Sequence, residues 1–214
     1  LHEFGHSLHG MLSTCRHSSL SGTNVVRDFV ELPSQLMENW LDEREWLQSF
    51  AVHYQTGEAL PEILIERMER ARHFLAGYAA CRQLSFGYLD MAWHTITEPL
   101  AEGLDTKTFE DMAWQKAQLL PATPAPCQMS TSFGHIFSGG YAAGYYGYKW
   151  AEVLDADAFA AFQEEGIFST ATAERFRREV LSQGDRRDAE DLYQSFRGKK
   201  ATIDALLRRD GIER

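Results

Sequence analysis

The sequence predicts a mainly α-helical protein with one sizeable core. Two observations carry this prediction. Apolar residues recur at three- and four-residue spacing along the longer segments, which is typical of helices that bury one face. In addition, 44% of the 214 residues are apolar and 24% are charged, a composition that suits a globular chain with a polar surface.

The first predicted helix runs from the start of the chain to about Cys15. Apolar residues on one face of it are expected to point inward, at Leu8, Met11, Leu12 and Cys15.

This helix opens with His2-Glu3-Phe4-Gly5-His6, which matches the H-E-x-x-H pattern of zinc sites. Two histidines four residues apart lie on one helix face and can bind one cation, while the glutamate beside them can act as a general base. The alternative is an amphipathic helix start with two exposed histidines. His9 lies near the same face, but a fourth protein ligand would close the position that catalysis needs, so packing or an outer contact suits it better.

A second helix is predicted to begin near Asp28, an acceptable N-cap residue, with Pro33 close to the start. A catalytic zinc takes three protein ligands, so a carboxylate from this helix would complete the site. Glu31 is the predicted third ligand, and Glu38, seven residues later on the same face, is its rival or an outer carboxylate. The alternative is that Asp28 and Glu31 only cap the helix.

A long helix is predicted from Pro61 to about Thr97, because proline is tolerated in a first helical turn. Its methionine and aromatic residues are expected to lie in the core. A further helix is predicted over Asp105–Leu119, and a proline-rich loop within the same catalytic unit over Leu120–Met129. The inward stripe of the long helix is predicted at Ile65, Met68, Ala71, Arg72, Leu75, Tyr78 and Ala79.

Glycines and tyrosines alternate between Phe133 and Trp150. Each glycine inside a helix costs about 1 kcal/mol relative to alanine, so this backbone is predicted to serve another purpose. Glycines let a peptide substrate approach closely, and phenolic O–H groups can donate to an oxyanion. The alternative is a packed helix start with tyrosines in the core. Regular helices are predicted afterwards at Tyr146–Phe162, Ala171–Ser182, Asp188–Phe196 and Thr202–Arg209.

Charge and cysteine content restrict the partners and the compartment. The net charge of -10, from 21 Lys and Arg against 31 Asp and Glu, disfavours a nucleic acid partner. Cys15, Cys81 and Cys127 are widely spaced and form no C-x-x-C pair, so we expect reduced thiols in a cytoplasmic protein. No apolar run approaches the roughly 20 residues of a membrane span.

Three motifs in order carry a family resemblance: LHEFGHSLHG from Leu1, SGTNVVRDFVELPSQLMENW from Ser21, and FGHIFSGGYAAGYYGYKWAEVL from Phe133. Together they resemble the thimet-oligopeptidase-like family of zinc metallopeptidases, and the likeness extends to the C-terminal GKKATIDALLRRDGI. No matched motif position is broken. The resemblance implies one zinc ion per chain and residue roles as follows: zinc ligands His2, His6 and Glu31, general base Glu3, an acidic residue behind the ligands at Asp28, and substrate-binding, transition-state-stabilising residues at His135, Tyr141 and Tyr148.

The resemblance also implies a zincin-like helical catalytic lobe of a larger two-lobed peptidase. Residues 1–214 would be the C-terminal part of the catalytic domain, and an N-terminal portion, absent from this chain, would form the other wall of the substrate channel. A ligand helix that begins at Leu1 with no N-cap residue before it agrees with that expectation.

Expected substrates are oligopeptides. Within the family, SGTNVVRDFVELPSQ favours a peptidyl-dipeptidase, which releases C-terminal dipeptides, over an oligopeptidase A-like endopeptidase. A hypothesis of another class is an inactive helical module that binds metal weakly or only associates with a partner. A periplasmic location stays open beside the cytoplasmic one.

Overall fold

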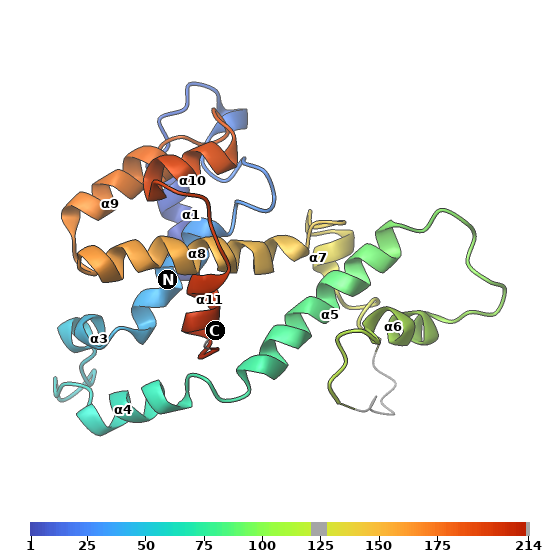
Figure 1. The fold of residues 1–214 in the computed structure, drawn as a ribbon, viewed down its shortest axis with the longest axis horizontal. Helices are drawn as coiled ribbons and strands as arrows, with labels where there is room; N and C mark the ends of the chain where they lie inside the picture. The colour runs from blue at the N-terminus through green and yellow to red at the C-terminus, as the bar shows by residue number, and fades with distance from the viewer. Residues whose placement is uncertain (121–127, 213–214) are drawn as a thin grey trace. The chain divides into compact units, whose positions relative to one another are not determined.

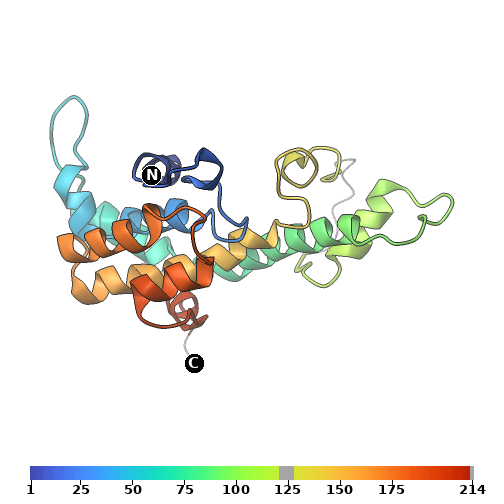
Figure 2. The same cartoon turned by 90° about the horizontal axis from the view of Figure 1, so that it is seen from above.

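Helices are the regular elements that the computed structural model shows in the residues it describes, 1–120 and 128–212 (Figure 1). Over those residues the β structure is limited to one isolated antiparallel bridge between Val52 and Ala59, and the turned view likewise shows helices joined by loops (Figure 2). The predicted mainly α class is therefore confirmed. None of the described helices is both long and apolar enough to cross a membrane.

The chain divides into two compact units. The first consists of Leu1–Phe74 and Trp150–Arg214, and the second of Leu75–Lys149. The division falls at these two points and not at the predicted proline-rich loop. Residues 121–127 of that loop, with Cys127, lie outside the described residues, whereas Cys15 and Cys81 are free thiols, as predicted.

The first unit contains most of the helices. Short 3-10 turns, η1 and η2, join its first elements, and a π-helical turn, η3, continues α9. Its elements are α1 (His2–Met11), η1 (Ser18–Leu20), α2 (Leu32–Glu38), η2 (Asn39–Asp42), α3 (Arg44–Phe50), α4 (Glu62–Ala71), the main part of α8 (Tyr146–Glu165), α9 (Thr170–Phe176), η3 (Arg177–Leu181), α10 (Ala189–Arg197) and α11 (Asp204–Arg209).

Aromatic residues from α8 and η2 build the core of the first unit. The Trp40 ring meets Phe159 and Phe162 edge-on, with centroids 4.8 and 5.0 Å away. Leu32 and Leu36 of α2 are buried in the same cluster, and Leu8 of α1 and Leu12, the residue after this helix, pack against the cluster. The core therefore fixes α2 and gives α1 an apolar face to rest on.

The second unit contains α5 (Ala76–His94), α6 (Thr106–Trp114), α7 (Gly134–Phe137) and the first residues of α8. Asp105 caps α6 by accepting the backbone N–H of Thr108 at 2.8 Å. A small core of Phe86, Leu89, Phe133 and Ile136 joins α5 to α7.

Two predicted helix ends near the motif are wrong. The first helix ends at Met11 and not at Cys15, because the chain turns away and the Thr14 N–H donates to Ser182 O at 3.0 Å. The second begins at Leu32 and not near Asp28, because Pro33 occupies its first turn and Glu31 is the residue before it.

The predicted helix over Pro61–Thr97 is also wrong, since it is interrupted. The helix α4 ends at Ala71 and α5 begins at Ala76, with Leu75 in the left-handed conformation at φ +57°. The predicted inward stripe holds on neither side of this break: Ile65 is 1% exposed, but Met68 of α4 is 48% and Tyr78 of α5 is 41% exposed. Predicted helices near the C-terminus are present with ends shifted by a few residues.

Candidate metal site

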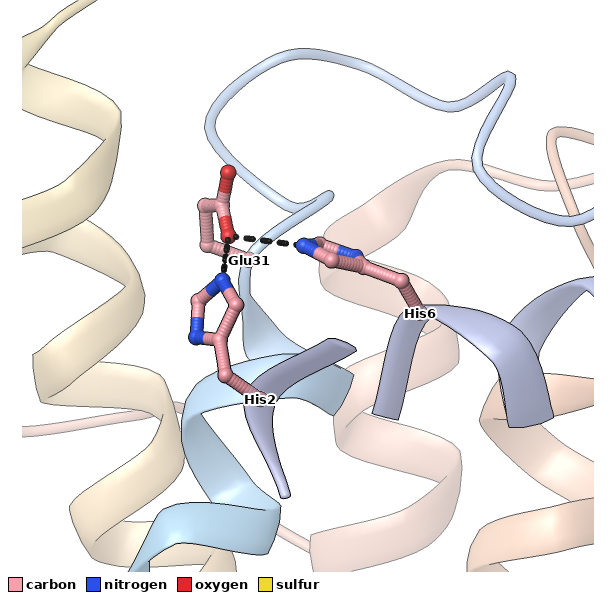
Figure 3. A group of neighbouring side chains, drawn as sticks. All are labelled: His2, His6 and Glu31. Carbon is pink, nitrogen blue, oxygen red and sulfur yellow. Dashed lines mark ion pairs between the residues drawn. The ribbon is translucent and has the colours of Figure 1, made fainter. Parts of the chain in front are cut away.

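Two histidines of α1 and one glutamate before α2 converge in the first unit (Figure 3). Glu31 Oε2 lies 3.4 Å from His2 Nε2 and 3.2 Å from His6 Nε2. One ligand atom from each of the three residues lies within 4.8 Å of the other two. The structure thus brings the three predicted metal ligands together, from segments about 25 residues apart in the sequence.

This geometry fits a zinc ion. Ligand bonds of about 2.0–2.1 Å at a tetrahedral angle place neighbouring ligand atoms about 3.3 Å apart, which is close to both distances at Glu31. Two imidazoles and one carboxylate are also the donor set of several catalytic zinc sites, where a fourth position is left for water or substrate.

Glu31 is held in place by its own turn. Its side chain is 2% exposed, and Oε2 accepts the Ser34 hydroxyl at 2.9 Å. The hydrogen bond from His6 to Glu31 raises the pKa of His6, against the lowering effect of burial and with smaller contributions from the charges of Glu31 and Glu3. The buried carboxylate therefore favours a positive charge at this point, as a cation site requires.

Glu38 contacts the other nitrogen of the His2 ring. Its Oε1 lies 2.5 Å from His2 Nδ1, whereas Glu31 is near the other ring nitrogen, Nε2. Histidine ligands usually donate their second ring N–H to a carboxylate, which fixes the tautomer and the ring orientation. The spacing had left Glu38 as a rival ligand or an outer carboxylate, and its position suits the outer role. Asp28 is half-buried in the turn before α2, and its predicted role stays a prediction.

Gly5 lets α1 approach α2 closely enough for this convergence. A Cβ at Gly5 would lie 2.4 Å from Pro33 O and 2.5 Å from Ser34 Cα, both on the backbone. Gly5 has no role among those predicted from the sequence. Its position in the sequence could have indicated this role, because a glycine inside a helix lowers helix stability and is favoured there mainly where another backbone comes close.

His9 is buried in the same helix but stands apart from the three-residue group. Neither of its ring nitrogens has a hydrogen-bond partner among the described residues. Burial, and to a smaller extent the charge of His6, lowers the pKa of His9 to about 4. It is therefore a neutral, packed histidine at neutral pH.

A second group of predicted residues gathers in the second unit. The rings of Tyr141 and Tyr148 stack with centroids 4.9 Å apart, and the His135 ring lies 6.1 Å from the first and 6.4 Å from the second. Tyr145 lies 5.0 Å from Tyr148 and donates its O–H to Gln83 Oε1 at 3.3 Å. We call His135, Tyr141, Tyr145 and Tyr148 the aromatic cluster.

Comparison with known proteins identifies the family. The model of peptidase family M3 matches residues 1–212. A dipeptidyl carboxypeptidase of Salmonella typhimurium is 42% identical over 100% of this chain and 31% of its own length, and oligopeptidase A of Escherichia coli is 44% identical over 99% and 31%. Saccharolysin of Saccharomyces cerevisiae is 33% identical over 99% and 30%.

The chain thus spans about a third of the length of the curated relatives it matches. The residues that the family model matches include the converging histidines, Glu31 and the aromatic cluster. The resemblance noted in the motifs is confirmed: this chain belongs to peptidase family M3.

Proposed function

We propose that the chain carries the zinc site of a metallopeptidase that hydrolyses oligopeptides and releases C-terminal dipeptides. The observation that supports this most directly is the position of Glu31 Oε2, 3.4 Å from His2 Nε2 and 3.2 Å from His6 Nε2. Membership of family M3 supports peptide hydrolysis, and a relative at 42% identity is named dipeptidyl carboxypeptidase.

In this proposal His2, His6 and Glu31 hold the metal. When bound, zinc supplies Lewis acidity, which polarises the scissile carbonyl and lowers the pKa of water to about 7. Glu3 takes a proton from the attacking water and later gives one to the leaving amine. Its side chain is exposed, which keeps the carboxylate accessible to solvent and substrate.

His135, Tyr141 and Tyr148 of the aromatic cluster would stabilise the negative charge that develops on the scissile carbonyl oxygen. Phenolic O–H groups of Tyr141 and Tyr148, and a ring N–H of His135, can donate to the oxyanion formed from the carbonyl. These roles come from the family resemblance and are supported by the mutual proximity of the three rings. The place of Asp28 behind the metal ligands is likewise proposed from the family resemblance.

The choice between two activities rests on the motif around Glu31. Relatives named for either activity are nearly equally similar, at 42% and 44% identity, so overall identity does not decide. Mass spectrometry of the products of one nonapeptide, cleaved by the full-length protein, tests the choice. Sequential loss of C-terminal dipeptides is expected, whereas internal cuts would indicate an oligopeptidase A-like endopeptidase.

The proposal includes a longer enzyme, with an N-terminal portion as the other wall of the channel, and a cytoplasmic location. The competing hypothesis is a helical module without activity. Metal analysis and a cleavage assay on the full-length protein separate the two classes: one zinc per chain with turnover supports the peptidase, and neither would favour the module.

A further inference from the structure

Asp90 is a completely buried carboxylate near the C-terminal end of α5, with 0% of its surface exposed. A buried charge is costly unless donors surround it. Oδ1 accepts the backbone N–H of Ala143 at 2.9 Å and lies 2.8 Å from His94 Nδ1. Oδ2 accepts the backbone N–H of Tyr145 at 2.9 Å. Each oxygen of Asp90 thus accepts a backbone N–H from a residue more than 50 positions away, while the hydrogen bond of His94 Nδ1 is made with the backbone O of Asp90, at 2.8 Å.

Those two donors belong to a turn with an unusual backbone. Ala143 has φ +53°, in the left-handed region that a residue with a Cβ rarely adopts. The Gly144 N–H closes the turn on Tyr141 O at 2.9 Å. A conformation of this kind persists only where its surroundings hold it, and such positions cluster at functional sites. Asp90 accepts hydrogen bonds from the residues on both sides of Gly144.

The turn joins the members of the aromatic cluster. Tyr141 precedes it and Tyr148 follows it, and the two rings stack at 4.9 Å. Tyr145, whose N–H Asp90 holds, packs its ring against Phe133 at 4.9 Å and Tyr148 at 5.0 Å. Fixing the backbone at 143 and 145 therefore fixes how the rings of Tyr141 and Tyr148 lie against each other.

We infer that Asp90 is a positioning residue: it holds the turn at Ala143 and Tyr145 so that Tyr141 and Tyr148 face a peptide substrate in one arrangement. This rests on the function proposed above and adds a residue to it. Asp90 acts through the two tyrosines.

The first test is Asp90→Asn in the full-length protein. Asparagine keeps the size of the side chain but replaces one acceptor oxygen with an NH₂ group, which cannot accept a backbone N–H. We expect kcat to fall tenfold or more, KM to change less than threefold, and zinc content to stay at its normal value. An unchanged kcat would overturn the inference.

Glu110→Gln is the matched control. Glu110 lies on α6 of the same unit and is also 0% exposed. Its carboxylate accepts the backbone N–H groups of Met129, at 3.1 Å, and of Ser130. It thus tests the loss of a buried carboxylate that holds backbone outside the turn. We expect it to lower thermal stability but to leave kcat within twofold. An equal loss of kcat in both variants would mean a general packing effect and would contradict the inference.

A double-mutant cycle shows whether Asp90 works through the tyrosines. In a Tyr141→Phe, Tyr148→Phe background, the extra loss from Asp90→Asn should shrink below threefold, because the hydroxyls that Asp90 positions are gone. The same loss in both backgrounds would overturn the inference. A normal kcat of the Tyr141→Phe, Tyr148→Phe enzyme would instead show that neither hydroxyl stabilises the oxyanion, which contradicts the proposed function. If Asp90→Asn still lowered kcat in that enzyme, Asp90 would not act by positioning the two tyrosines.

Amide hydrogen exchange of the unaltered protein gives an answer even if Asp90→Asn does not fold. The N–H groups of Ala143 and Tyr145 should exchange at least tenfold more slowly than that of Ala142, for which the described residues show no acceptor. Exchange of all three at the same rate would show that Asp90 does not hold the turn.

Discussion

Glu38 Oε1 lies 2.5 Å from Nδ1 of His2, while Glu31 Oε2 lies 3.4 Å from Nε2 of the same ring. One imidazole is thus fixed between two carboxylates with different tasks. The carboxylate at Nε2 is buried beside His6 and can share a metal with it, whereas the carboxylate at Nδ1 is 49% exposed and can only orient the ring.

This relationship predicts unequal effects of two substitutions on zinc affinity. Glu38→Gln should weaken zinc binding by about 10–100-fold, because it removes an orienting partner. Glu31→Gln should weaken it considerably more, because it removes a charged ligand. Zinc titration of the two variants against a chelator measures both. Equal losses would mean that Glu31 is not a ligand.

A second prediction separates metal binding from chemistry at Glu3. Glu3→Gln should keep one zinc per chain and lose at least 99% of kcat, since a general base contributes about 10²–10⁴-fold to the rate. Metal content and steady-state kinetics of the full-length protein are the measurements. Loss of zinc in this variant would show that Glu3 has a structural role.

The close approach of α1 and α2 gives a third prediction. Gly5→Ala forces a methyl group against the Pro33 and Ser34 backbone, at 2.4–2.5 Å, so it should destabilise the fold by about 1–3 kcal/mol and weaken zinc binding. Gly10→Ala is the control in the same helix, because a Cβ there meets nothing within 4 Å. It should be neutral or stabilising by up to about 1 kcal/mol in urea unfolding. Equal behaviour of the two variants would contradict the packing argument.

The sequence was informative about the metal site because helix geometry alone places His2 and His6 on one face. Glu31 was harder to select, since Glu38 shares its face by spacing and only the family resemblance ranked the two. Their separate contacts depend on how α1 docks against α2, which Gly5 allows. That docking is a tertiary contact, which the periodicity of apolar residues along the sequence does not predict.

The wrongly predicted helix ends and the unpredicted role of Asp90 likewise depend on tertiary contacts. Neither glycine nor proline marks the break between α4 and α5, and Leu75 adopts φ +57° without the residue type that usually signals it. Asp90 interrupts an apolar run, Leu89-Asp90-Met91, and such a residue is normally solvent-exposed on a helix. The structure instead buries it and lets it accept the N–H groups of Ala143 and Tyr145, two contacts that the local sequence does not indicate.

A fourth prediction concerns acid stability. Asp157 in α8 is 2% exposed and accepts the Tyr193 hydroxyl at 2.5 Å and Lys199 Nζ at 2.9 Å. Burial raises the pKa of Asp157, but these two donors and the Arg197 charge outweigh it, so the net pKa is lowered. The stabilisation is therefore present above the ordinary aspartate pKa near 4 and is lost as the pH falls through the lowered value.

Asp157→Asn should accordingly lower the free energy of unfolding at pH 7 by about 2 kcal/mol, the scale of a hydrogen bond to a charged group. The difference from the unaltered protein should shrink as the pH falls from about 4 through the lowered pKa of Asp157, because the carboxyl is protonated first in the unfolded chain and only at lower pH in the folded one. Urea unfolding at several pH values measures this. A difference that stays constant down to pH 2 would show that the charge of Asp157 does not contribute.

The last prediction concerns the aromatic cluster. Tyr148→Phe removes one O–H with little change in packing, so kcat should fall by roughly a hundredfold while KM changes little, the pattern of an interaction made mainly in the transition state. Tyr145→Phe is the control, because Tyr145 has a neighbouring ring but donates its O–H to Gln83 within the fold. It should cost about 1 kcal/mol of stability and leave kcat nearly normal. A comparable kcat loss in both variants would point to packing. Near-normal kcat for Tyr148→Phe would exclude its oxyanion role and leave Tyr141 and His135 as the donors to test, because their rings lie nearest to Tyr148 among the residues that the family resemblance assigns.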